Sequence, residues 1–215
     1  MSQLASGVSP IRLPTNHALR STPRLPTPPP PDPENELPFL SPELLTSTLK
    51  KIHKSRSQLR LHLFQTTETP FQNIHIGALI FNGPKLLVIK HVVDETCCYD
   101  IPSRKMADED FSVIRALIGV VKEQTGMEVA LVVRELMPAF QFKIPWVVHG
   151  EQFWSPCVQL NFVVGVRAGG FDSGNGRENL FWIEEGEGRE MDMPDGVKGL
   201  VRWAFADRLI HGSWI

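Results

Sequence analysis

The chain has 215 residues and a formal net charge of −2 at pH 7, with 42% hydrophobic and 21% charged residues. This length and composition suit a soluble globular protein, with one domain and a smaller extension. The charge balance argues against a dedicated DNA-binding protein, and no apolar run reaches the ~18 residues of a membrane-spanning helix.

The three cysteines are Cys97, Cys98 and Cys157. Adjacent cysteines rarely bridge each other, an odd number leaves at least one thiol free, and no Cys/His spacing fits zinc. We therefore expect a reduced cytoplasmic or nuclear protein. Arginines precede the first acidic residue, Asp32, so a mitochondrial targeting segment is the alternative, although prolines would interrupt its amphipathic helix.

Residues 1–38 are rich in Ser, Thr and Pro and poor in large apolar side chains. Such a segment cannot bury enough surface to offset its ordering entropy, so we predict a disordered tail. The run Pro28–Pro31 favours a polyproline conformation, which either binds a proline-recognising partner or is a plain spacer.

Residues 39–71 are predicted to form a helical extension that ends in a linker at Thr66–Pro70. Ser41 suits the N-cap, Pro42 suits the first helical position, and leucines recur at helical spacing as far as Ile52. A basic cluster follows, either as a solvated face or as a surface for phosphates or an acidic partner. It comprises Lys50, Lys51, His53, Lys54, Arg56 and Arg60.

Asn73–His91 has the pattern of a β-hairpin, with isoleucines alternating on one face of its first strand. Asn82–Gly83 supplies the turn residues. Because Pro84 cannot donate to the ladder, we expect a turn longer than two residues. His75 and His91 have no partner at metal-ligand spacing and are interpreted as ordinary strand positions.

The stretch Ile101–Met127 is predicted as a loop, a helix and a stop at Gly126. On a helical wheel Val120 falls on the apolar face, Gln124 lies in the same arc and Glu123 lies at its edge. The other apolar-face residues are Val113, Ile114, Leu117, Ile118 and Val121.

The remaining chain alternates strands and loops before a final helix. Val129–Val133, Val158–Arg167 and Asn179–Ile183 are predicted strands. The aromatic residues between the first two are interpreted as a long loop because prolines interrupt them; this loop would either cover the sheet or line a substrate pocket. Pro194 and Asp195 open the last helix. Its expected inner residues are Val197, Leu200, Val201, Ala204, Phe205 and Leu209.

Two motifs resemble the signature box of the Nudix hydrolases. VKEQTGM resembles the close of that box, and Ile101–Lys105 resembles its Leu-Pro-Gly-Gly-Lys opening. The resemblance implies an α/β fold, a Nudix-like α/β/α sandwich with a mixed β-sheet, spanning residues 72–215. It also implies Mg²⁺ held by box carboxylates, and cleavage of a nucleotide-linked or other organic diphosphate.

Several positions depart from the box. Glu123 retains one helix carboxylate, whereas Gln124 stands for the second and Val120 for the third. Gly119 stands where an arginine braces the acids. Asp110 is the nearest candidate for the first box glutamate, at a spacing one residue too long.

The resemblance therefore assigns catalysis to Glu123 and the metal to Glu123 and Asp110. Arg104 and Lys105 would meet the substrate phosphate, or form a solvated loop pair. Two functions stay open: a divergent Nudix-type hydrolase of weak activity, or an inactive Nudix-like domain that binds a nucleotide or a protein partner. Other acids are interpreted as surface residues or as recruits to the site: Glu109, Glu135, Glu178, Glu184 and Glu185.

Overall fold

The structure is a computed structural model that describes residues 37–42, 44, 46–93, 95–167 and 177–212. Residues Leu37–Ile215 form one compact unit. The tail predicted for residues 1–38 lies outside the described residues, apart from its last two positions.

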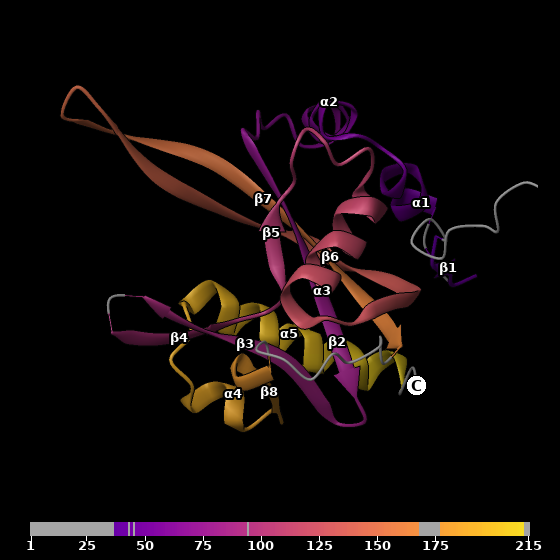
Figure 1. The fold of residues 1–215 in the computed structure, drawn as a ribbon. Coiled ribbons are helices and arrows are strands. Elements are labelled where there is room, and N and C mark those ends of the chain that lie inside the picture. Colours follow the sequence, from indigo (N-terminus) through magenta and orange to yellow (C-terminus); the bar gives the residue numbers. More distant parts are fainter. Residues whose placement is uncertain (1–36, 43, 45, 94, 168–176, 213–215) are drawn as a thin grey trace, which may run out of the picture. The chain divides into compact units, whose positions relative to one another are not determined.

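A mixed sheet of eight strands runs through the described residues (Figure 1). Its order is β1-β6-β7-β2-β3-β4, with β5 paired to β2 and β8 paired to β3. The β1–β6 and β2–β7 pairs are parallel, and the other pairs are antiparallel. The strands are β1 Phe39–Leu40, β2 Asn73–Asn82, β3 Lys85–Val93, β4 Thr96–Asp100, β5 Ser103–Lys105, β6 Glu128–Val148, β7 Glu151–Arg167 and β8 Leu180–Ile183.

Helices cover both faces of this sheet. Because successive strand side chains point to opposite faces, β2 contributes Ile76 and Ile80 to a core beneath α3, and Leu79 to a core beneath α5. These layers confirm the predicted α/β/α sandwich with a mixed sheet. None of the described helices is long and apolar enough to cross a membrane. The helices are α1 Thr46–Ile52, α2 Arg56–Thr67, α3 Val113–Thr125, α4 Glu187–Glu190 and α5 Asp195–His211, with a 3₁₀ turn at Arg177–Asn179.

The β2–β3 hairpin is confirmed, but the prediction of a longer turn is wrong. Asn82 pairs with Lys85, so only Gly83 and Pro84 connect the strands. Gly83 takes a positive φ of 52°, as the first position of a tight hairpin turn can require. Pro84 lies in the turn itself, where its missing backbone N–H is not needed for a hydrogen bond between the strands.

The helical extension is two helices rather than one. The first helix begins at Thr46 rather than directly after Ser41, and the Ser41 N–H donates to the carbonyl oxygen of Val132, next to the parallel β1–β6 pairing. The second helix, α2, has its own capping box at Ser55, and its buried Leu59 joins the core beneath α3. Lys51 of α1 forms a buried ion pair with Glu135 of β6, 2.6 Å apart, so both helices belong to the main core.

The aromatic stretch predicted as a loop is a projecting hairpin. β6 continues to Val148 and β7 begins at Glu151, around a tip at His149 and Gly150 with φ of 51° and 84°. Two-residue alternation of aromatic and other residues fits strands, and prolines are tolerated on open edges. We call Gln141–Pro156 the arm, because β2 pairs with β7 only from Cys157 onward (Figure 1).

The last helix begins at Asp195, as predicted. Four of its expected inner residues are buried: Leu200, Val201, Ala204 and Phe205. Leu209 was assigned wrongly to the inner side, since 79% of it is exposed.

Candidate functional site

The opening of the box is a short strand rather than a free loop. β5 pairs antiparallel with β2, so that Lys105 lies opposite His75, Arg104 opposite Ile76 and Ser103 opposite Gly77. This pairing fixes the backbone of β5 beside helix α3.

Helix α3 has the predicted ends and the predicted apolar face. Ser112 caps its first turn, and Gly126 ends it with a φ of 69° and an N–H that donates to Lys122. Val120 is fully buried with the rest of the apolar face. The prediction that this position has turned from metal binding to packing is consistent with that burial.

Gln124 holds β5 against the helix. Its Oε1 accepts from the Ser103 N–H at 2.9 Å, and its Nε2 donates to the Ser103 carbonyl oxygen at 2.8 Å. A carboxylate could accept the first bond but could not donate the second. Gln124 therefore positions the loop, and its amide oxygen is already used.

Arg104 occupies the space beside Gly119. A Cβ atom built on Gly119 would lie 2.9 Å from Arg104 Nη2, so the absence of a side chain there makes room for the guanidinium. Arg104 Nη2 and Nη1 donate to Asp110 Oδ1 and Oδ2 at 2.6 and 2.8 Å. Its Nε lies 3.5 Å from Glu123 Oε2, near enough to attract the charge but without a hydrogen bond.

The structure thus brings Arg104, Asp110 and Glu123 together. The positive charge between the two carboxylates is the guanidinium of Arg104. The hydrogen bonds to Asp110, aided by the charges of both acids, raise the pKa of Arg104 against the opposing effect of burial. The guanidinium remains protonated under all ordinary conditions.

These residues do not fit a magnesium ion in this arrangement. Asp110 Oδ1 and Oδ2 accept from Arg104, and Oδ2 also accepts from the Ala107 N–H at 2.7 Å. Within the described ranges, no three or more His, Cys, Asp and Glu side chains are grouped so that they could hold a metal ion. Metal binding by Asp110 and Glu123 stays a prediction, and it would require Arg104 to leave.

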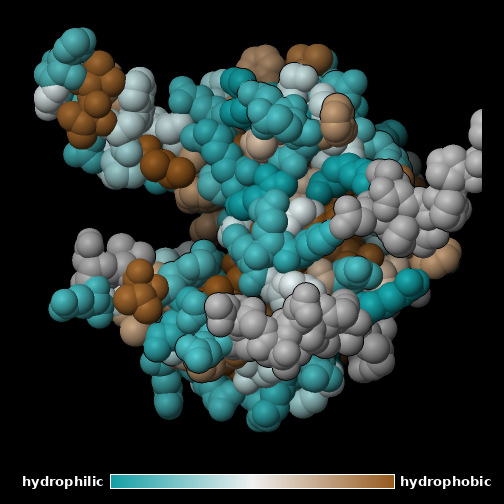
Figure 2. All heavy atoms as spheres, viewed as in Figure 1, coloured by the Kyte–Doolittle hydropathy of each residue, from teal (hydrophilic) through white to brown (hydrophobic). Residues whose placement is uncertain are grey.

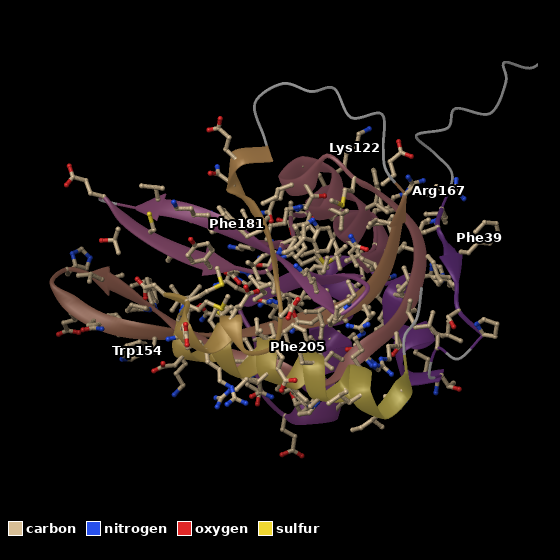
Figure 3. The ribbon with its side chains drawn as sticks, turned by 90° about the horizontal axis from the view of Figure 1, so that it is seen from below. Phe39, Lys122, Trp154, Arg167, Phe181 and Phe205 are labelled. Atoms are coloured by element: carbon tan, nitrogen blue, oxygen red, sulfur yellow. The ribbon has the colours of Figure 1, made fainter. Side chains whose placement is uncertain are left out.

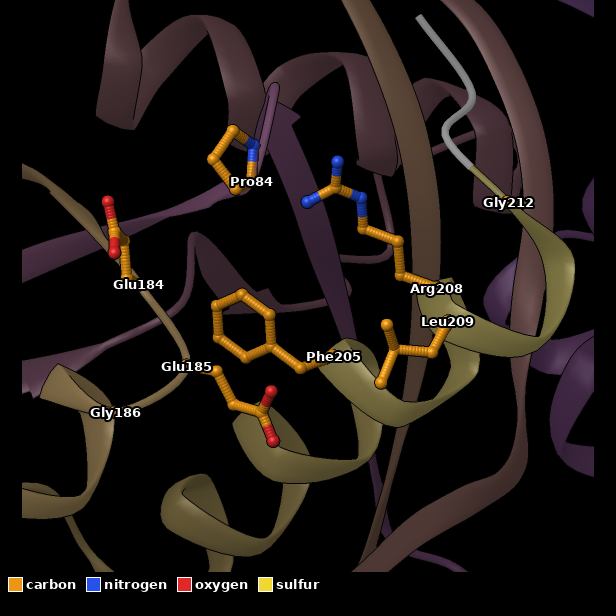
Figure 4. Close-up of a pocket in the computed structure, with 8 residues that line it drawn as sticks. All are labelled: Pro84, Glu184, Glu185, Gly186, Phe205, Arg208, Leu209 and Gly212. Atoms are coloured by element: carbon orange, nitrogen blue, oxygen red, sulfur yellow. The ribbon is translucent and has the colours of Figure 1, made fainter.

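Three of the acids considered as recruits to the site are placed elsewhere by their contacts. Glu135 is buried, where it accepts from Thr48 as well as Lys51. Glu184 and Glu185 line a separate cavity of about 490 Å³ at the β2–β3 turn and the end of α5 (Figure 4). The other lining residues are Pro84, Gly186, Phe205, Arg208, Leu209 and Gly212.

Lys105 lies next to an aromatic wall on the opposite sheet face from α3. Its strand neighbour His75 meets the ring of Phe142 edge-on at 5.2 Å, and Phe142 stacks on Phe140 at 5.5 Å. Burial lowers the pKa of His75, and the positive charge of Lys105 lowers it further. His75 is therefore mainly neutral near pH 7, and its buried Nε2 has no hydrogen-bond partner among the described residues.

Buried amides form the floor behind this wall. Gln159 Nε2 donates to Asn161 Oδ1 at 2.7 Å, and β7 places these residues beside His75 and Gly77. A Cβ on Gly77 would lie 2.3 Å from Asn161 Oδ1, so only glycine leaves room for this pair. The cluster was not predicted from the sequence; its one signal there is the set of polar positions that alternate with apolar ones along β2 and β7.

No family model matches the chain, and no curated protein matches it. Three solved structures show what it resembles. A NUDIX hydrolase from Nitrosomonas europaea is 17% identical, with a TM-score of 0.46 over 66% of this chain and 97% of that one. A MutT protein from Bacillus halodurans is 16% identical, with a TM-score of 0.45 over 60% and 80%. A UDP-X diphosphatase is 13% identical, with a TM-score of 0.47 over 73% and 72%. Resemblances at this level carry no argument about function.

Proposed function

We propose that this chain is a Nudix-like domain that binds a ligand combining a phosphate or diphosphate with a flat ring, such as a nucleotide. Magnesium-dependent hydrolysis at its box is weak or absent. The carrying observation is Arg104, which donates to both oxygens of Asp110 and lies 3.5 Å from Glu123. Divalent ions need several free oxygen ligands, whereas the Asp110 carboxylate already accepts three hydrogen bonds, two from Arg104 and one from Ala107.

The phosphate end of the ligand would meet Lys105. Arg104 is neutralised by Asp110, whereas Lys105 is exposed and has no ion-pair partner in the part of the chain that the structure describes. An ammonium group on a flexible stem suits a phosphate as a point charge.

The ring end would stack on the aromatic wall. Phe140 and Phe142 are each half-buried, so part of each side chain is exposed, while the tip of the Phe140 ring packs against Gly196 of α5. Such stacking contributes about 0.5–1.5 kcal/mol beyond area burial. The buried Gln159–Asn161 pair lies on β7 and satisfies both amide groups beneath the wall.

A weak hydrolase is the second candidate, and one observation favours it. The Glu123 side chain is 62% exposed, so the carboxylate of this box residue stays accessible on α3, on the other side of the sheet from Lys105. Catalysis would require Arg104 to move away from Asp110 during turnover.

Calorimetric titration with ADP, with EDTA and again with Mg²⁺, tests the proposal. We expect binding in both buffers, weakened roughly tenfold by Lys105→Ala, because one charge-assisted contact is worth about 1.5 kcal/mol. Lys50→Ala, a matched exposed lysine on α1, should bind as the wild type does.

A hydrolysis screen over nucleotide-linked diphosphates with Mg²⁺ separates the two candidates. The binding proposal predicts no robust turnover. Robust turnover that vanishes in Glu123→Gln would establish the hydrolase. Absence of ADP binding in either buffer would refute the ligand assignment.

A further inference from the structure

The arm exposes apolar side chains on both of its faces. Trp146 pairs with Phe153, and Trp154 pairs with Pro145, so the two tryptophans lie on opposite faces of the ribbon. Trp146 is 46% exposed, Trp154 56% and Val147 68%. Figure 2 shows apolar atoms along the projecting arm, and Figure 3 places Trp154 at the opposite end of the sheet from Phe39.

An isolated two-stranded hairpin is only marginally stable in water, because it has too little neighbouring surface to cover its side chains. Solvated ribbons normally keep at least one polar face. No described strand pairs with the outer edges of the arm, and neither of its faces is wholly polar. The composition of the arm therefore suits a position that is covered by a partner.

The outer edge of β7 is open along the arm. β2 reaches only Cys157, and the Gln72 N–H closes the edge at Pro156. Glu151–Ser155 therefore has no strand partner on its outer side among the described residues, and only its last residue, the buried Ser155, is hydrogen-bonded through its hydroxyl to Gln72 and Asn73. This segment contains no proline or lysine, the residues that commonly protect an edge.

The opposite edge of the arm, on β6, does contain a lysine and a proline. It carries Lys143 and Pro145, which respectively place a charge on the edge and remove a backbone donor. Any strand that adds to the arm therefore meets fewer obstacles on β7.

The charge of the arm identifies the kind of partner. Lys143 and Glu151 are its only charged residues besides His149, so the arm is close to neutral. It offers nothing to attract a strongly acidic or basic molecule, and two copies of it meet without like-charge repulsion.

We propose that Glu151–Ser155 pairs antiparallel with the same segment of a second copy of this chain. An antiparallel edge is self-complementary about a two-fold axis. Centred on Phe153, the pairing places Gln152 opposite Trp154 of the second copy and Glu151 opposite its Ser155. β6 and β7 of both copies then form a continuous four-stranded ribbon.

The exposed apolar area of the arm contributes a substantial part of the area that a stable dimer interface buries. Phe153, Trp146 and Trp154 are each about half exposed, which leaves roughly 300 Å² of aromatic surface uncovered per chain. Ile144, the polar side chains and the open backbone of β7 add to it, towards the ~800 Å² per partner of a standard interface.

Sedimentation velocity over a wide concentration range tests the pairing. The wild type should form a dimer. Trp154→Lys should raise the dimer dissociation constant roughly tenfold or more, because it adds charge and removes an aromatic anchor. Adding Gln152→Glu should restore part of the affinity at low salt, because the register places the new carboxylate opposite the new ammonium.

Val147→Lys is the matched control, since it changes an exposed apolar residue of the same arm on the protected strand. It should leave the dimer intact, and the thermal unfolding of all variants should show that the domain remains folded. The proposal is overturned by a wild type that stays monomeric at all concentrations. It is equally overturned by a dimer that Trp154→Lys leaves unchanged, or by one that Val147→Lys weakens as much as Trp154→Lys does.

Discussion

Restoring the second box glutamate, by Gln124→Glu, should destabilise this protein. In the structure Gln124 donates to the Ser103 carbonyl oxygen at 2.8 Å while accepting from the same residue's N–H at 2.9 Å. The substitution keeps the accepting oxygen but turns the donor into a second carboxylate oxygen, which faces the carbonyl.

The expected cost follows from these contacts. Losing a hydrogen bond and leaving two oxygens facing each other costs about 1–3 kcal/mol. Gln124 is half-buried, so we take about 2 kcal/mol. For a domain of this size that corresponds to a fall in Tm of about 4–8 °C.

The cost should depend on pH. The ionised form of the new carboxyl is disfavoured in the folded protein, so its folded pKa lies above the unfolded value of about 4.3. Between these values the folded state binds more protons, and stability therefore falls as pH rises through the folded pKa. The variant should be much closer to the wild type at pH 4.5 than at pH 7.5.

Urea unfolding at both pH values measures this prediction. Glu123→Gln is the matched control, because it changes the exposed neighbouring carboxylate and should cost less than about 1 kcal/mol. A Gln124→Glu protein as stable as the wild type at pH 7.5 would refute the proposed role of Gln124 in holding β5.

Three further predictions concern stability. Lys51→Met should lower the free energy of unfolding by about 3–5 kcal/mol, because Glu135 would be left buried and unpaired; Lys50→Met on the exposed side should change it by less than about 0.5 kcal/mol in the same urea titration. Gly77→Ala should cost about 1–3 kcal/mol by calorimetry, since the new methyl group would lie 2.3 Å from a buried amide oxygen. The folded pKa of His75 lies below the unfolded value of about 6.5, so the unfolded state binds more protons and stability falls as pH falls through 6.5; His75→Phe should flatten that slope in unfolding curves.

Local patterns in the sequence predicted the parts of the fold that depend on neighbouring residues. Helical periodicity placed Val120 on the buried face of α3, and a glycine after the last periodic residue placed the stop at Gly126. The alternation of apolar and polar residues predicted the β2–β3 hairpin, because this pattern also depends only on residues that are close in the sequence.

The site could not be predicted in this way because its contacts join separate elements. Gln124 contacts Ser103 only because β5 pairs with β2 beside α3. From the sequence, Gly119 was interpreted only as the loss of the box arginine. In the structure its missing side chain makes room for Arg104 from β5. A helix pattern contains no information about the side chain that a neighbouring strand places against it.

The arm was misread because its prolines were taken as loop signals. Pro145 and Pro156 both lie within paired strands. Proline interrupts a central strand, but on an open edge the missing donor costs little. Whether the outer edge of β7 is free depends on where β2 begins, which is at Asn73 opposite Cys157.

Titration with Mn²⁺, followed by electron paramagnetic resonance, tests most directly whether Arg104 takes the place of a metal at the box. The wild type should show no saturable site with a dissociation constant below about 1 mM. Arg104→Gly frees Asp110 and Glu123 and should bind Mn²⁺ more tightly than the wild type. A sub-millimolar site in the wild type that disappears in Asp110→Asn would contradict the account.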